Sequence, residues 1–167
     1  LAEQYNRPPD LIVKSTPWTQ KAEGQDQWWQ PLVPTGLTED RWVKGIEIRP
    51  TAAGRGVVHH VVTNLVQQEE KYGAVDVNGG GYFSEFAVAK IGDVFRENTG
   101  KLMKAGSAIR FDIHYHSVGE EITDSVELGI YFYPKGQEPK YRQVLGLFSS
   151  IAGGSRNIDI PPESTFV

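Results

Sequence analysis

The sequence predicts an all-β protein, an antiparallel β-sandwich of jelly-roll type, and three observations lead to this fold class. Residues 109–118 place apolar Ile109, Phe111 and Ile113 at every second position, and residues 124–134 repeat the alternation. A period of two is typical of a β-strand with one buried face. Turn-forming residues recur at short intervals between such runs, and no long stretch has convincing helical periodicity. Short strands separated by turns favour a sandwich.

The first half of the chain is expected to contribute three strands. Prolines near the start favour an extended lead-in, which a short strand over residues 11–14 follows. A turn at residues 34–36 precedes a strand over residues 40–50. Residues 51–56 form a glycine-containing turn that leads into the apolar run at residues 56–62. We expect the strands on either side of this turn to be neighbours.

The second half contains less regular segments. Residues 67–82 are polar and end in three glycines, which indicates an excursion from the sheet. Residues 84–98 are interpreted as an irregular loop, because their helical pattern is short and Gly92 interrupts it. Residues 141–148 and 157–160 supply two more strand candidates.

The length and composition of the chain limit the classes of protein to which it can belong. With 167 residues the chain has the size of one domain, and it can bury a core without disulfides. We expect residues 1–26 to form an extended lead-in with the first edge strand, and residues 27–167 the jelly-roll domain itself. The net charge is -4 and no run of basic residues occurs, so we expect no nucleic-acid binding. No apolar stretch approaches the roughly 18 residues of a membrane span.

The chain has no cysteine, which excludes disulfides, thiolate metal ligands and cysteine nucleophiles. Its 4 histidines, however, all lie in two short strand-like runs. His114 and His116 project from one face of a regular strand. His59 and His60 are adjacent and point to opposite faces unless a bulge or twist turns one of them. Pairing of the two runs can therefore place three imidazoles around one ion.

Three imidazoles suit zinc, copper, iron or nickel, whereas calcium and magnesium prefer oxygen ligands. A single buried histidine is more often a hydrogen-bonded core residue than a ligand. Four histidines in two runs favour a metal site, because burying titratable groups without partners costs free energy. No HExxH motif is present to select a hydrolytic zinc site.

Four other residues each have a structural and a functional interpretation. Asp112 is expected to face away from His114 and to have a structural or supporting role. Met103 is expected in the core rather than on a metal. Trp28 and Trp29 are expected to pack in the core or at an edge, rather than to form a substrate platform.

Four motifs occur in order along the chain, namely Glu39-Asp40-Arg41-Trp42-Val43, Glu47-Ile48-Arg49-Pro50, Val58-His59-His60-Val61 and Ile113-His114-Tyr115-His116. Together they resemble the copper type II, ascorbate-dependent monooxygenases, the family of peptidylglycine and dopamine monooxygenases, and its bacterial relatives most of all. The resemblance covers roughly residues 27–162. Its specificity comes from the His-His pair combined with the later His-Tyr-His motif and the upstream Arg-Trp-Val strand.

The resemblance implies an N-terminal jelly-roll domain that binds one copper ion for electron transfer. Carried over motif by motif, the copper ligands are His59, His60 and His114. His116 has no counterpart among the ligands of the animal enzymes, and a supporting role, a substitute ligand and an acid-base group stay open for it. Ascorbate or another reductant is the implied electron donor, and a periplasmic or secreted location is implied as well.

In that family a second domain carries the oxygen-activating copper on a His-x-His motif and a methionine. No second His-x-His follows in this chain, and the second domain would be expected to start near residues 159–162. We therefore expect the partner to be a second copper domain of the same parent polypeptide. The chain by itself is expected to bind and cycle copper but to hydroxylate little.

Two alternatives come from other functional classes. One is a stand-alone copper-binding or copper-delivery module without catalysis. The other is a single-domain enzyme, either a histidine-rich copper oxidase or a zinc hydrolase with an open coordination position. Loss of activity with metal retained in His116→Ala would support the enzyme. A purely structural sandwich is the fourth possibility.

Overall fold

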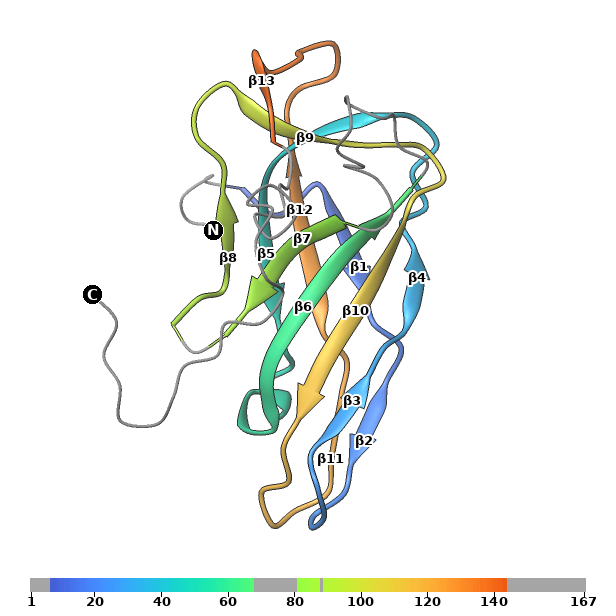
Figure 1. Ribbon diagram of the computed structural model, residues 1–167, viewed down its shortest axis with the longest axis vertical. Coiled ribbons are helices and arrows are strands. Elements are labelled where there is room, and N and C mark those ends of the chain that lie inside the picture. Colours follow the sequence, from blue (N-terminus) through green and yellow to red (C-terminus); the bar gives the residue numbers. More distant parts are fainter. Residues whose placement is uncertain (1–6, 68–80, 88, 144–167) are drawn as a thin grey trace, which may run out of the picture.

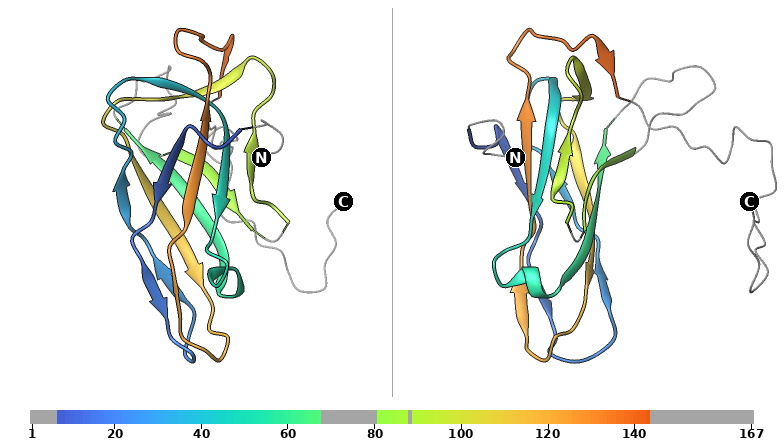
Figure 2. Two further views of the ribbon diagram at one scale, coloured as in Figure 1. Left: turned by 180° about the vertical axis from the view of Figure 1, so that it is seen from behind. Right: turned by 90° about the vertical axis from the view of Figure 1, so that its left-hand side faces the viewer.

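The computed structural model describes residues 7–67, 81–87 and 89–143. Apart from one short 3-10 turn, every regular element among them is a β-strand. Two large sheets face each other across a shared apolar core (Figures 1 and 2). The predicted all-β sandwich is therefore confirmed, while its jelly-roll type stays a prediction. Within the described ranges, no helix has the length and apolar character that crossing a membrane requires.

The first sheet has the strand order β1-β12-β5-β9-β13, with β8 also paired to β5. Its strands are β1 (Leu11–Lys14), β12 (Glu127–Phe132), β5 (Arg41–Arg49), β9 (Thr99–Met103), β13 (Tyr141–Arg142) and β8 (Gly92–Val94). All pairs are antiparallel except β13 with β9, which run parallel.

The second sheet carries the histidines and has the order β3-β10-β6-β7, with β4 also paired to β10. Its strands are β3 (Gln27–Trp29), β10 (Ala108–Tyr115), β6 (Val58–Val66), β7 (Gly81–Phe86) and β4 (Leu32–Pro34). A small third sheet pairs β11 (Ile122–Asp124) with β2 (Trp18–Gln20). The two histidine-bearing strands, β6 and β10, are neighbours along almost their whole length.

Strand β10 shows how the alternating sequence builds the core. Ile109, Phe111 and Ile113 are fully buried. Strands β5 and β12 of the other sheet contribute Ile46 and Leu128 to the same cluster. Each such side chain contributes about 1.5–3 kcal/mol when fully buried. A continuous core between two sheets thus supports this chain, which has no disulfide.

The connection from β5 to β6 crosses between the sheets, so the prediction that these strands are neighbours is wrong. The buried carboxylate of Asp124 fixes this connection. It accepts hydrogen bonds from the Thr51 N–H at 2.9 Å, the Thr51 hydroxyl at 2.7 Å and the Tyr115 hydroxyl at 3.1 Å. The 3-10 turn η1 (Gly54–Gly56) packs so closely here that a Cβ on Gly54 would lie 2.1 Å from Asp124 Oδ1. After this crossing, β6 lies in the second sheet, beside β10.

Two further expectations differ from the structure or lie outside it. The segment read as an irregular loop, residues 84–98, contains the end of β7 and all of β8. The loop prediction is therefore wrong where these strands lie. The segment has no single period because its two strands belong to different sheets. The predicted strand over residues 141–148 begins as β13, and its remainder lies outside the described residues, as do residues 157–160 and most of the excursion at 67–82.

Candidate metal centre

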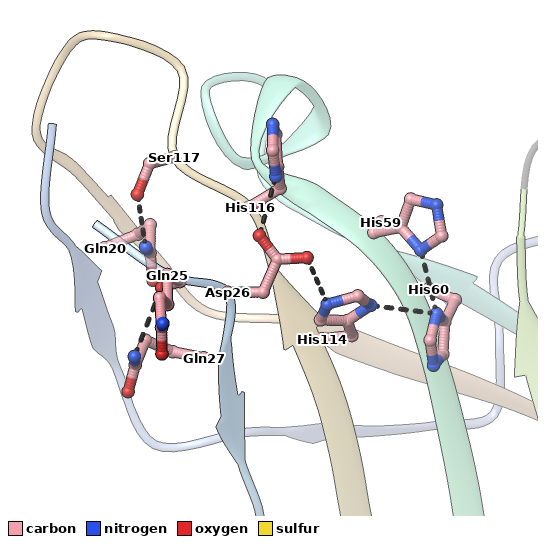
Figure 3. A network of polar contacts seen from close by, with 9 residues as sticks. All are labelled: Gln20, Gln25, Asp26, Gln27, His59, His60, His114, His116 and Ser117. Atoms are coloured by element: carbon pink, nitrogen blue, oxygen red, sulfur yellow. Dashed lines mark hydrogen bonds and ion pairs between the residues drawn. The ribbon is translucent and has the colours of Figure 1, made fainter. Parts of the chain in front are cut away.

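Three of the four histidines converge at one end of the β6–β10 pair (Figure 3). His60 on β6 lies directly opposite His114 on β10. One ring nitrogen from each of His59, His60 and His114 lies within 4.8 Å of the other two. His59 is exposed, His60 is half-buried and His114 is only 8% exposed. The three residues that the sequence proposed as ligands are therefore brought together.

A β-bulge explains how two adjacent histidines reach the same place. The β6–β10 register pairs His114 with His60 but Tyr115 with Val58, so His59 has no direct partner on β10. An extra residue of this kind bends its strand and redirects its side chain. The bulge thus turns His59 toward His60 and His114, where a regular strand would point it to the opposite face.

The three rings present the same atom to one another. The Nδ1 atoms of His59 and His60 are 3.0 Å apart, and those of His60 and His114 are 3.3 Å apart. An ion bound at about 2.0–2.1 Å by two imidazoles, at angles between square and tetrahedral, holds their nitrogens about 2.9–3.4 Å apart. A hydrogen on His60 Nδ1 can serve only one of its two neighbours well. A cation satisfies all three lone pairs at once, so the donor set fits a metal ion.

The electrostatic surroundings keep His60 in the form that binds metals. Burial, followed by the neighbouring His114 and His59, lowers the pKa of His60, while Asp112 and Glu85 act in the opposite direction. A lower pKa favours the neutral imidazole, whose free lone pair is the ligand. His60 therefore stays neutral, and able to bind a metal ion, at a lower pH than an unperturbed histidine would.

Asp112 was expected to face away from His114, and this is wrong. Residues two apart on a regular strand share a face, and the shift in register comes only after His114. Asp112 accordingly lies close enough to raise the pKa of His60. Within the described part of the chain its buried Oδ1 has no hydrogen-bond partner. The acid contributes negative charge beside the ligands.

His116 does not join the three converging rings. It bonds instead through Nδ1 to Oδ1 of Asp26, at 2.7 Å, while Oδ2 of the same carboxylate lies 2.8 Å from Nε2 of His114 (Figure 3). Sequence reasoning missed Asp26, which precedes β3 in a polar loop. No local signal marks it, because only the pairing of β3 with β10 carries it to the histidines.

The two tryptophans divide between core and site. Trp29 packs against the core and stacks on Trp18 with ring centroids 5.0 Å apart. Trp28 lies on the edge strand β3, is 54% exposed, and stacks on His114 with centroids 4.1 Å apart and ring planes 8° from parallel. The prediction that both tryptophans pack in the core or at an edge is therefore confirmed. Trp28 packs on His114, which is a candidate ligand. Met103 is fully buried in the core, as predicted.

An open pocket of about 390 Å³ adjoins two of the three candidate ligands. Its lining residues are His59, His60, Val62, Glu85, Phe86 and Ala87. Strand β6 thus forms one wall and the end of β7 the other. A small molecule in this pocket would contact the ligand side chains from the side away from Trp28 and β3.

No protein-family model matches the chain, and no curated protein matches its sequence. The assignment of the site therefore depends on its own geometry. Three Nδ1 atoms face one point from two paired strands, at spacings that suit one metal ion. The described residues contain no other such cluster of potential ligands.

Proposed function

We propose that this domain holds one copper ion on His59, His60 and His114 and serves in one-electron transfer. The observation that carries the proposal is the convergence of three Nδ1 atoms at 3.0 and 3.3 Å spacings. Imidazole is a ligand that both Cu(I) and Cu(II) accept. The chemistry that copper supplies is the change between these states, with an electron taken from a reductant such as ascorbate and passed to an acceptor.

The chain's own residues favour such a role through rigidity. His60 and His114 sit opposite each other within a paired sheet, so neither has to move when the charge of the ion changes. Trp28 covers one face of the His114 ring. His59 is exposed and gives the site an edge at the protein surface. A constrained ligand set with one accessible edge suits electron exchange.

The motif resemblance supports the finer part of the proposal. It implies that the acceptor is an oxygen-activating copper in a second domain of the parent polypeptide, and that the whole acts as an ascorbate-dependent monooxygenase. On this proposal the isolated chain reduces its copper with ascorbate but hydroxylates little. Coupled hydroxylation by the purified chain alone would contradict the proposal that a second domain activates oxygen.

The test is metal content and EPR spectroscopy after loading with Cu(II), and metal content after loading with Zn(II). We expect one tightly bound copper per chain, with a type II spectrum rich in nitrogen ligands. His59→Ala and His114→Ala should each lose this signal. Glu23→Gln is the control, because it changes an exposed side chain of the loop before β3, outside the converging set, and should retain the copper. Absence of copper binding, or binding that survives both ligand substitutions, would overturn the proposal.

A specific observation favours a second candidate, a single-domain enzyme. The pocket of about 390 Å³ beside His59 and His60 leaves room for a small molecule next to the ligands. Open coordination positions are typical of catalytic rather than structural metal sites. If azide changes the EPR spectrum of the copper-loaded chain, and the chain alone turns over an oxidisable or hydrolysable substrate, this candidate replaces the electron-transfer domain.

A further inference from the structure

The loop before β3 brings two side chains to the outer side of His114. Asp26 places one carboxylate oxygen 2.8 Å from His114 Nε2 and the other 2.7 Å from His116 Nδ1. Trp28, two residues later, covers the His114 ring at 4.1 Å. Figure 3 shows Asp26 between the two histidines, on the side of His114 away from His60. The ring of His114 is therefore held at its face by Trp28 and at its far nitrogen by Asp26.

The chemistry of these contacts determines which nitrogen of His114 is free. An ionised carboxylate only accepts hydrogen bonds, so His114 must donate through Nε2–H. In a neutral imidazole the other nitrogen then carries the lone pair. That nitrogen is Nδ1, the atom that lies 3.3 Å from His60 Nδ1. The contact with Asp26 thus selects the tautomer that the metal centre requires.

The position of Asp26 is fixed by backbone pairing. Strand β3 is antiparallel to β10, with Trp28 opposite His114 and Gln27 opposite Tyr115. This register sets Asp26 just beyond the end of the pair, where it reaches His114 on β10 and His116 just after the strand. His116 holds the carboxylate from the other side and is itself 62% exposed in its side chain.

We propose that Asp26 is a positioning residue of the metal centre, which orients His114 through its Nε2–H and strengthens binding of the more highly charged metal state. The inference rests on the proposed function of His59, His60 and His114. A carboxylate behind a ligating histidine fixes its orientation and raises its basicity. Its negative charge also stabilises Cu(II) more than Cu(I), so Asp26 lowers the reduction potential. His116 acts through Asp26, as a tether.

A plain surface ion pair is the competing explanation, since exposed pairs contribute little to stability. That explanation predicts no change in metal affinity or reduction potential when Asp26 is replaced. Burial argues against it, because His114 is 8% exposed and both its ring nitrogens have partners in the site. A contact on a buried ligand constrains that ligand, whereas a contact between two solvated side chains does not.

The experiment compares wild type with Asp26→Ala, Asp26→Asn and His116→Ala. Glu23→Gln is the matched control, because it removes an exposed acid from the same loop. One readout is the tautomer of His114 in metal-free protein, from long-range proton–nitrogen NMR correlations. The others are Cu(II) and Cu(I) affinity by competition, and the reduction potential.

We expect Asp26→Ala to populate the Nδ1–H tautomer of His114 and to weaken Cu(II) binding by about 10–100-fold, with a smaller loss for Cu(I). Asp26→Asn keeps an acceptor oxygen, so it should preserve the tautomer while the potential rises. His116→Ala should weaken Cu(II) binding less than Asp26→Ala, and Glu23→Gln should change nothing.

The outcomes separate this inference from the function on which it rests. Copper binding by wild type, with Asp26→Ala unchanged in tautomer, affinity and potential, overturns the role of Asp26 alone. A rise in potential that Glu23→Gln reproduces also overturns it, because loop charge rather than contact would then be the cause. Failure of the wild-type chain to bind copper overturns both proposals.

Discussion

Replacing Asp124 by Ala tests whether the crossing between the sheets controls the metal centre. Asp124 is 1% exposed and accepts three hydrogen bonds, two from Thr51 and one from Tyr115. Burial, and then the Asp124 charge, raises the pKa of Tyr115, which keeps the phenol protonated as a donor. Loss of the carboxylate therefore leaves the buried Tyr115 hydroxyl and the partly buried Thr51 donors without this acceptor.

The size of the effect follows from these three bonds. Each hydrogen bond to a charged group is worth about 1.5–3 kcal/mol, but removal of a buried charge also relieves its desolvation cost, so we expect a loss of about 3–5 kcal/mol in unfolding free energy. For a chain of this size the melting temperature should fall by about 6–20 °C. Asp124→Asn keeps an acceptor for Thr51 and should cost about 1–2 kcal/mol.

The assay is urea unfolding of the metal-free protein, followed by circular dichroism, together with Cu(II) affinity under conditions where each variant is folded. Affinity should fall in Asp124→Ala, because η1 and the start of β6 lose their anchor. Glu120→Ala, an exposed acid in the turn before β11, is the control and should stay within about 0.5 kcal/mol of wild type. A cost below about 1 kcal/mol in Asp124→Ala would refute the argument that this carboxylate anchors the crossing.

Three more predictions follow from single contacts. Gly54→Ala should destabilise the protein by about 1–3 kcal/mol in urea unfolding, because its Cβ would lie 2.1 Å from Asp124 Oδ1; a neutral result would mean that the turn shifts freely. Trp28→Phe should remove most of the Cu(II)-induced quenching of tryptophan fluorescence, since Trp28 stacks on His114, and quenching that persists would place the ion elsewhere. For Asp10, partial burial would raise the pKa, but hydrogen bonds from Arg7 and from a backbone N–H outweigh it and lower the pKa below 3.8. The stabilising effect of Asp10 is therefore complete above its unfolded pKa and is lost as the pH falls through the lower folded value. Asp10→Asn should accordingly be less stable than wild type at pH 7 in chemical unfolding, with a gap that closes below about pH 4; a gap independent of pH would exclude the charge as its cause.

Much of the fold can be predicted because alternation is a local property. Ile109, Phe111 and Ile113 face the core in the structure as their spacing predicts. The short strands β2, β3, β4 and β11 were missed, since three residues carry too little periodicity to be recognised. The two strands joined by the turn at residues 51–56 were assigned to one sheet, because a turn in the sequence does not reveal whether the chain folds back or crosses over.

The sequence by itself determined the all-β class through alternation and showed that the histidines cluster in two runs, and the motif resemblance then implied His59, His60 and His114 as candidate ligands. Only the tertiary structure decided that a bulge turns His59 toward the other two, that His116 binds a carboxylate, and that Asp26 and Trp28 complete the surroundings of His114. The physical reason is that periodicity fixes which way a side chain points along its own strand. Pairing register fixes which side chains of distant strands meet, and it depends on the packing of the whole sandwich.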